Sequence, residues 1–328
     1  MKSIKIFAIA SLVGFGLASC NEDTVSTATG DWIKESDLDG AARHAAVGFD
    51  IANKGYVGLG SDEDNKKLLD FWEYNPATKA WKQLADFKGA GRTAAVGFSA
   101  NNKGYVGTGL DVNEEKLKDF WEYDPAANKW TRKADFEGTA RRNAVAFTIN
   151  NIGYVGTGFD DSYLKDFYAY NANTNTWKKT ASIGGTKRLG AASFVIDGKA
   201  YVGTGNNNGT NLTDFWMYDP TTDIWTEKLS FTDATITNTS IARSYGVGFS
   251  VNGKGFFALG TNSKTVWKFD PTANTWEEVR SFEGTTRTYA VAWSINNKGY
   301  ITTGSSGTYR FDDIWSFTPD VEQVDTAK

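Results

Sequence analysis

An arginine recurs six times in this chain, each time a few residues ahead of an apolar stretch. The series is Arg43, Arg92, Arg141, Arg188, Arg243 and Arg287. A guanidinium can hold a carboxylate, sulfate or phosphate through two parallel hydrogen bonds, so several at one opening would form a site for an anionic ligand. The alternative is structural: each arginine bonds loop carbonyls or the aspartate of an "ADF" segment, such as Asp86 or Asp135. The sequence leaves both interpretations open.

Two further arginines, Arg142 and Arg310, lie outside this series. Because they break the repeat, they are better candidates for ligand specificity than the residues that keep it. Loop tyrosines and asparagines add groups that sugar sites use, aromatic faces and amides, although loop composition explains them equally well. The full set of ligand-binding candidates is Arg43, Arg92, Arg142, Arg188, Arg243, Arg287, Arg310, Tyr163, Asn207 and Tyr309.

Other constellations are weaker. His44 is the only histidine and stands beside Arg43, where it could act as a base or contact a ligand, or be an ordinary polar rim residue. The acidic run 62–64 could ligate calcium, but it lacks the spaced ligands and glycine of a calcium loop and is typical of a solvated loop. Cys20 is the only cysteine, which excludes a disulfide framework or zinc cluster. We expect no metal and no cofactor.

The elements that must position these residues are repeated. "FWEYNPATKAW" at 71–81 returns as "FWEYDPAANKW" at 120–130, which is the mark of a repeat architecture. The tryptophan that closes this string recurs at Trp32, Trp81, Trp130, Trp177, Trp225 and Trp276, and the "GYVGTG" type of segment also occurs six times. The sequence therefore predicts six units of roughly fifty residues.

Each unit has room for four short strands. The aromatic string predicts a hairpin, because Asn-Pro or Asp-Pro favours a type I turn and the flanking aromatic rings can pack across it. Four-stranded units that cannot bury their own faces stack radially into a β-propeller. Trp32 has no strands before it, and the last unit, 285–319, never supplies its tryptophan strand. We therefore expect the N-terminal strand to complete the sixth blade.

Loops alternate between the two faces of such a disc. The turns joining strands one to two and three to four are short and uniform, whereas the loops on the opposite face vary, as at 61, 110, 159, 206 and 305 and in the inserted segment 230–240. We call this second face the variable face. The arginine series should stand there, near the opening of the central channel, and variable loops on a rigid scaffold are the usual place of function.

These residues resemble the kelch motif: glycines after an apolar strand, then a Tyr or Phe paired with a Trp further on. The pairs are Tyr74/Trp81, Tyr123/Trp130, Tyr170/Trp177, Tyr218/Trp225 and Phe269/Trp276. The resemblance covers about residues 30–319 and implies an all-β, six-bladed kelch-type propeller with four antiparallel strands per blade. Kelch propellers serve enzymes and binding proteins alike, so the fold does not decide the function.

Within this family, copper radical oxidation as in galactose oxidase is excluded. That chemistry needs two histidines and a tyrosine linked to a cysteine, and this chain has one histidine and no unmodified cysteine. The chain also resembles the six-bladed kelch N-acetylneuraminate epimerases, although no catalytic glutamate can be carried over residue by residue. The sequence does not decide whether the protein is an enzyme, and we favour a protein without catalytic activity.

The N-terminus reads as a targeting segment. Lys2 and Lys5 precede an apolar run of about a dozen residues, too short to span a bilayer. The run ends in Leu-Ala-Ser-Cys at 17–20, which resembles the lipobox of bacterial lipoproteins, and the following acidic residues resemble surface-export signals of Bacteroidetes lipoproteins. We expect a signal peptide at 1–19, lipidated Cys20 with a flexible tether at 20–29, the propeller at 30–319 and a tail at 320–328.

Together these features predict an outer-membrane lipoprotein, at the cell surface or on the periplasmic side, that touches the membrane only through its lipid. Its favoured function is to bind a glycan or a partner protein at the variable face. The arginines there favour an anionic ligand. A sugar-active enzyme and a structural or assembly protein are the alternatives. Without Lys2 and Lys5 the chain has 33 basic against 39 acidic residues, which argues against nucleic acid. We expect a monomer.

Overall fold

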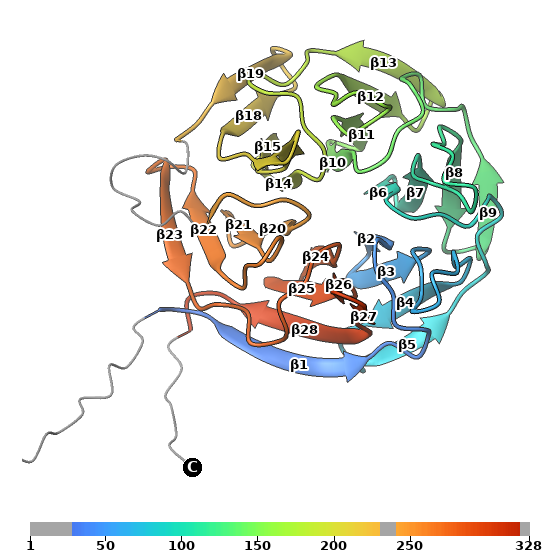
Figure 1. The fold of residues 1–328 in the computed structure, drawn as a ribbon, viewed down its shortest axis with the longest axis horizontal. Helices are drawn as coiled ribbons and strands as arrows, with labels where there is room; N and C mark the ends of the chain where they lie inside the picture. Colours follow the sequence, from blue (N-terminus) through green and yellow to red (C-terminus); the bar gives the residue numbers. More distant parts are fainter. Residues whose placement is uncertain (1–27, 230–240, 322–328) are drawn as a thin grey trace, which may run out of the picture.

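The structure is a computed structural model, and it describes residues 28–229 and 241–321. Among these residues there is no α-helix, and the strands form six four-stranded antiparallel sheets and two short two-stranded ribbons. Figure 1 shows the sheets as blades around a central axis. The predicted all-β, six-bladed propeller is therefore confirmed.

Blades one to three each take four consecutive strands. Blade one contains β2 (Val47–Ile51), β3 (Lys54–Gly58), β4 (Phe71–Asn75) and β5 (Ala80–Gln83). Blade two contains β6 (Val96–Ala100), β7 (Lys103–Gly107), β8 (Phe120–Asp124) and β9 (Lys129–Arg132). Blade three contains β10 (Val145–Ile149), β11 (Ile152–Gly156), β12 (Phe167–Asn171) and β13 (Thr176–Thr180).

The remaining blades include the two ribbons in their loops. Blade four contains β14 (Ala192–Ile196), β15 (Lys199–Gly203), β18 (Phe215–Asp219) and β19 (Ile224–Glu227), with the ribbon β16 (Asn206–Asn207) and β17 (Thr210–Asn211). Blade five contains β20 (Val247–Val251), β21 (Lys254–Ala258), β22 (Val266–Asp270) and β23 (Thr275–Val279). Blade six contains β24 (Val291–Ile295), β25 (Lys298–Thr302), β28 (Asp313–Thr318) and β1 (Asp31–Asp37), with the ribbon β26 (Ser305–Ser306) and β27 (Tyr309–Arg310).

The hairpins follow from local sequence. In the aromatic string at 71–81, Tyr74 lies opposite Trp81 with ring centroids 4.9 Å apart, and the Asn75 side chain accepts a hydrogen bond from the Ala77 amide at 3.0 Å. The turns between first and second strands have two residues with positive φ, such as Asn101 at 51° and Asn102 at 57°, as a type I′ turn requires. These tight turns all lie on one side of the disc, which we call the short-turn face.

Neighbouring blades pack through aromatic rings against glycine. The ring of Phe49 on β2 covers Gly104 on β7 of the next blade so closely that an added Cβ would lie 2.0 Å from it. Phe98 meets Gly153 in the same way. This contact explains the glycine of the repeated "KGY" segment, and it fills the space between blades with buried apolar groups.

The ring is closed by joining the two ends of the chain. Strand β1 pairs with β28, with Trp32 opposite Phe317, and Figure 1 shows β1 along the outer edge of blade six. Trp32 Nε1 donates to the Arg280 carbonyl of blade five at 3.3 Å, just as Trp130 Nε1 donates to Ala85 at 3.0 Å. The N-terminal strand completes the sixth blade as predicted.

Several predicted features lie outside the described residues. These are the signal peptide, Cys20, most of the tether, the inserted segment 230–240 and most of the C-terminal tail 320–328. Within the part that is described, no helix is long and apolar enough to cross a membrane.

Candidate functional site

The six repeated arginines are buried and internally paired. Arg43 is 0% exposed; its Nε donates to the Ala41 carbonyl at 2.9 Å, and Nη1 and Nη2 donate to the two carboxylate oxygens of Asp70 at 2.8 and 2.7 Å. Trp72 Nε1 donates to the same carboxylate at 2.6 Å. Five of the six form an ion pair with the aspartate that opens the third strand: Arg43–Asp70, Arg92–Asp119, Arg141–Asp166, Arg188–Asp214 and Arg287–Asp313. We call the six repeated residues the strut arginines.

This arrangement corrects the interpretation of the series as a cationic opening. The guanidiniums do not face solvent, and carbonyls and, in five blades, a carboxylate take up their donors, so they hold the loops of their own blade. The structural alternative named the wrong acids: Asp135 pairs with exposed Arg132 at 2.9 Å. Burial opposes ionisation of Asp119, but the hydrogen bonds and charge of Arg92 outweigh it and hold the pKa of this carboxyl below its usual value.

Blade five departs from this pattern. Thr265 stands where the other blades have aspartate, and the Arg243 Nη1 donates to its carbonyl at 2.9 Å. Burial lowers the pKa of Arg243 to about 10, although the charge of Glu278 opposes this shift.

The two residues after each strut arginine surround the opening of the channel on the variable face. The outer mouth positions are His44, Thr93, Arg142, Leu189, Ser244 and Thr288, and the inner mouth positions are Ala45, Ala94, Asn143, Gly190, Tyr245 and Tyr289. Each inner residue donates its amide to the carbonyl of the inner residue one blade back, at 2.9–3.2 Å, so that six hydrogen bonds form a closed ring. The architecture therefore fixes the backbone here and leaves the side chains free to vary.

The inner ring holds every member in the left-handed region, including two bulky residues. Tyr245 and Tyr289 have φ of 57° and 56°, a conformation that costs energy for such side chains and that proteins keep where the surroundings impose it. Their rings stack with centroids 4.3 Å apart and an interplanar angle of 25°. Gly190 lies beneath Tyr245, and a Cβ there would approach its ring to 2.6 Å. Two tyrosines thus lie together at the channel mouth.

Polar groups flank this tyrosine pair. The inner residues line a cavity of about 110 Å³, and the buried Asn143 side chain lies within it beside the Tyr289 hydroxyl. Burial, with a contribution from the neighbouring Tyr245, raises the pKa of the Tyr289 hydroxyl. The ring of Tyr289 also lies 6.0 Å from that of His44. Amide, hydroxyl and imidazole groups therefore converge on one opening.

His44 is a neutral base at this opening. Burial and then the charges of Arg310 and Lys67 lower its pKa to about 4. Its Nε2 lies 3.3 Å from the Ser61 hydroxyl, and its Nδ1 is buried with no hydrogen-bond partner. The neutral imidazole can accept or donate a hydrogen bond at Nδ1, depending on its tautomer.

The two arginines outside the series differ from the strut arginines in their partners. Arg142 packs over the Phe159 ring at 5.2 Å, and Arg310 donates to the carbonyls of Gly307 and Thr308 and to Asn65 Oδ1 at 3.2–3.3 Å. Neither forms an ion pair with a carboxylate of the described residues. Both therefore keep an uncompensated positive charge on the variable face.

The other candidates are spread around the loops. Tyr163 packs edge-on against Phe159 at 5.2 Å, beside Arg142, whereas Tyr309 is 72% exposed on the β26–β27 ribbon beside Arg310. Asn207 in blade four donates to the Lys187 carbonyl at 2.6 Å, which supports the ribbon β16–β17. The structure thus places Tyr163 with Arg142 in blade three and Tyr309 with Arg310 in blade six. It does not bring Asn207 to either pair.

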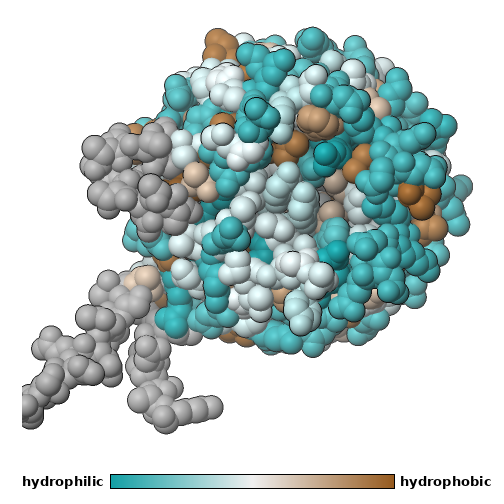
Figure 2. All heavy atoms as spheres, viewed as in Figure 1, coloured by the Kyte–Doolittle hydropathy of each residue, from teal (hydrophilic) through white to brown (hydrophobic). Residues whose placement is uncertain are grey.

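A second cavity lies between the variable loops of blades five and six. It measures about 170 Å³ and is lined by hydroxyl side chains, including Thr261, Thr288 and Ser305. Thr288 immediately precedes Tyr289, so this polar cavity adjoins the tyrosine pair. Seen along the axis, strongly hydrophilic side chains gather around the rim of the disc, and the surface nearer the axis is only weakly polar (Figure 2).

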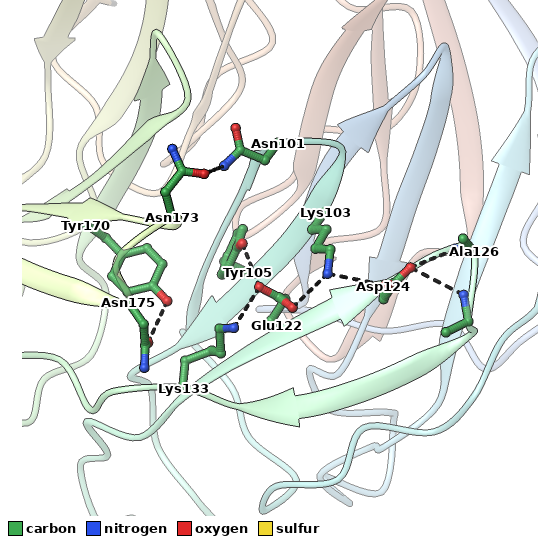
Figure 3. A network of polar contacts seen from close by, with 11 residues as sticks. Asn101, Lys103, Tyr105, Glu122, Asp124, Ala126, Lys133, Tyr170, Asn173 and Asn175 are labelled. Atoms are coloured by element: carbon green, nitrogen blue, oxygen red, sulfur yellow. Dashed lines mark hydrogen bonds and ion pairs between the residues drawn. The ribbon is translucent and has the colours of Figure 1, made fainter.

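Two other polar clusters are structural. In the acidic loop the Asp62 carboxylate accepts the amides of Asp64 and Lys66 at 3.1 and 2.9 Å, which stabilises a turn. In blade two Glu122 binds Tyr105, Lys103 and Lys133 (Figure 3). Across the described ranges, no three His, Cys, Asp or Glu side chains gather as a metal site would need.

Sequence reasoning missed Asn143, Tyr245 and Tyr289. Aligning the six units on the strut arginine and comparing the two residues that follow it would have found them. These positions vary while their surroundings repeat, and only blades five and six carry tyrosine there.

Fold and repeats define the chain as a six-bladed β-propeller of the kelch type. Two family models match it, described as the KLHDC2/KLHL20/DRC7 Kelch-repeats domain over residues 29–188 and as the Kelch motif over residues 187–228. Among solved structures, that of YjhT is similar, with a TM-score of 0.75, 17% identity, and coverage of 88% of this chain and 97% of that chain. No curated protein matches the sequence.

Proposed function

We propose that this protein is a lipid-anchored protein of the cell envelope that binds an anionic glycan at the mouth of its central channel. The observation that carries the proposal is the contrast between two kinds of arginine. Five of the six strut arginines pair with an aspartate of their own blade, whereas Arg142 and Arg310 have no carboxylate partner among the described residues. An acidic group on a ligand would satisfy them through charged hydrogen bonds.

The remaining groups at the mouth suit a sugar. Tyr245 and Tyr289 offer aromatic surface, Asn143 offers an amide, and the adjoining cavity offers hydroxyls that can exchange hydrogen bonds with those of a glycan. A partner protein with an acidic loop is the competing ligand, and it would need a larger contact than this mouth.

A sugar-active enzyme is the second candidate. The observation that favours it is His44, a neutral imidazole with an unpaired Nδ1 beside Tyr289 and near Arg310. Such a group could move a proton on a bound sugar. Turnover of a bound sugar, absent in His44→Gln, would favour this candidate over simple binding.

The binding experiment uses the soluble chain from Asn21 onward on a glycan array that includes sialic and uronic acids. We expect selective binding of acidic glycans that weakens as salt rises, because exposed charges are screened. Replacing Arg142 and Arg310 together with Ala should weaken binding about 10-fold or more. Arg132→Ala is the matched control, since this exposed arginine pairs with Asp135 away from the mouth. Affinity that ignores both the double variant and salt would overturn the proposal.

The anchor is tested separately. Cys20→Ser should move the protein from the membrane fraction to the soluble fraction with its melting temperature unchanged, because acyl chains and not the fold would hold it at the membrane. A variant that stays in the membrane pellet contradicts the lipid anchor and leaves the glycan proposal untouched.

A further inference from the structure

The innermost strands carry one residue each at a common level near the short-turn end of the channel. These residues are Asp50, Ser99, Thr148, Val195, Ser250 and Ser294. Five of the six are neutral, and Asp50 on β2 is the only acid. It borders a cavity of about 220 Å³ together with Ser99, Asn102 and Asn151. One blade therefore places a carboxylate where the others place hydroxyl or methyl groups.

The equivalent hydroxyls show what this position normally does. Thr148 Oγ1 donates to the Ser99 carbonyl of the preceding blade at 2.7 Å, and Ser294 Oγ accepts the Ser250 amide at 3.2 Å. These bonds join adjacent innermost strands around the channel. An ionised carboxylate has no proton to donate, so Asp50 cannot donate the first kind of bond to the innermost strand of blade six.

Asp50 also differs from the other enclosed acids of the chain. Asp70, Asp119 and Asp313 each pair with a strut arginine, and Glu122 with two lysines. Within the described ranges, Asp50 forms no ion pair and no side-chain hydrogen bond to another residue's side chain. Burial raises its pKa to about 6, and no neighbouring charged side chain contributes to this shift. Asp50 is partly buried, and a carboxylate in such a place without a partner of opposite charge is costly when ionised.

We propose that the short-turn end of the channel is a binding site for a hard, oxygen-seeking metal cation, with the Asp50 carboxylate as its charged ligand. The surrounding donors are hydroxyl, amide and backbone carbonyl oxygens, the ligands that Na⁺ or Ca²⁺ accepts. The same region lacks clustered His and Cys, which does not suit zinc or copper. The cation supplies the positive charge that Asp50 lacks and links blade one to blade two, whose Ser99 and Asn102 also line the cavity. This site is independent of the glycan site, which lies at the opposite end of the channel.

The test measures melting temperature of the whole soluble chain at neutral pH in a buffer whose only cation is tetramethylammonium. Adding Na⁺, K⁺, Mg²⁺ or Ca²⁺ one at a time should identify at least one ion that raises the melting temperature by about 2–4 °C. Asp50→Asn, which keeps the shape and removes the charge, should melt higher than the cation-free wild type and respond to none of these ions. Asp62→Asn, on the acidic loop of the variable face, is the matched control and should respond as the wild type does.

Acidification supplies a second readout. Because a proton competes with the cation for Asp50, the stabilisation by the cation should fade as pH falls through about 6. The proposal is overturned if no ion stabilises the wild type, if Asp50→Asn responds as strongly as the wild type, or if the cation-free wild type and Asp50→Asn melt alike. In the last case the ionised Asp50 carboxylate would not destabilise the fold, and no cation would be needed to balance it. Failure of Asp50→Asn to fold would transfer the decision to direct calorimetric titration of the wild type with the same ions.

Discussion

At the scale of single residues, Arg92 shows how this fold neutralises a buried charge. Its guanidinium is 0% exposed, bonds the carbonyls of Ala90 and Thr108 and pairs with both oxygens of Asp119. All of these partners belong to blade two, so Arg92 links the loop before the first strand of this blade to the loop before its third strand.

Replacing Arg92 with Ala should lower the free energy of unfolding by about 3–5 kcal/mol, because the Asp119 carboxylate is left enclosed without its partner. Arg142→Ala, one of the two unpaired arginines, should change it by less than about 0.5 kcal/mol. Denaturant titration of both variants checks this. Equal losses of unfolding free energy in the two variants would contradict the distinction between the buried strut arginines and the two unpaired arginines.

His44 makes stability depend on pH. Its pKa is about 4 in the folded protein, below the value near 6.5 of an unfolded chain, so the unfolded state binds more protons between these values. The contribution of His44 is therefore fully present above about pH 6.5 and is lost as pH falls towards 4. The melting temperature of the wild type should fall more steeply across this window than that of His44→Gln, by the equivalent of about 1 kcal/mol after solvent screening. Parallel curves for the two proteins would contradict the shift. Asp50 titrates in the same window with the opposite sign, but it is common to both proteins.

At the scale of elements, the junction between blades depends on a missing side chain. Gly104 on β7 receives the ring of Phe49 from the blade before it, and an added methyl group would overlap this ring. The equivalent residue of blade four is Ala200, which is fully buried, so that junction has adapted to a Cβ.

Gly104→Ala should therefore cost about 1–3 kcal/mol through overpacking. The reverse change in blade four, Ala200→Gly, should cost about 0.5–1 kcal/mol through chain entropy and a small void. Chemical denaturation of the pair measures the difference. If Gly104→Ala were as stable as the wild type, the Phe49 ring would not pack against Gly104 as closely as described.

At the scale of the whole molecule, stability depends on closing the ring with a strand from the other end of the chain. Trp32 packs against Phe282 and Phe317 at 4.9 and 4.6 Å and hydrogen-bonds to blade five. Without β1 the outer edge of β28 is left unpaired, which invites aggregation.

Trp32→Ala should destabilise the protein by about 3–5 kcal/mol, and removing residues 1–42 should cause a large fall in melting temperature or aggregation seen by size-exclusion chromatography. Because Trp81 is the equivalent residue inside an intact blade, Trp81→Ala serves as the control for losing one tryptophan. If the truncated chain melts as the full chain does, the ring is closed in another way.

The sequence by itself determined the repeat number, the hairpin register and the closure of the sixth blade. These features depend on side chains at fixed offsets, such as Tyr74 opposite Trp81, and a periodic pattern records such contacts directly. It also separated Arg142 and Arg310 from the repeated arginines, although their role in binding stays a prediction.

Only the tertiary structure decided which charges are available to a ligand. Arg43 meets Asp70 across 27 residues that include β2 and β3, and its side chain is buried in the folded blade. Asn143, Tyr245 and Tyr289 come from three different blades and meet only because six blades close around an axis. Burial and contacts across the channel are properties of the closed ring, and no local pattern in the chain encodes them.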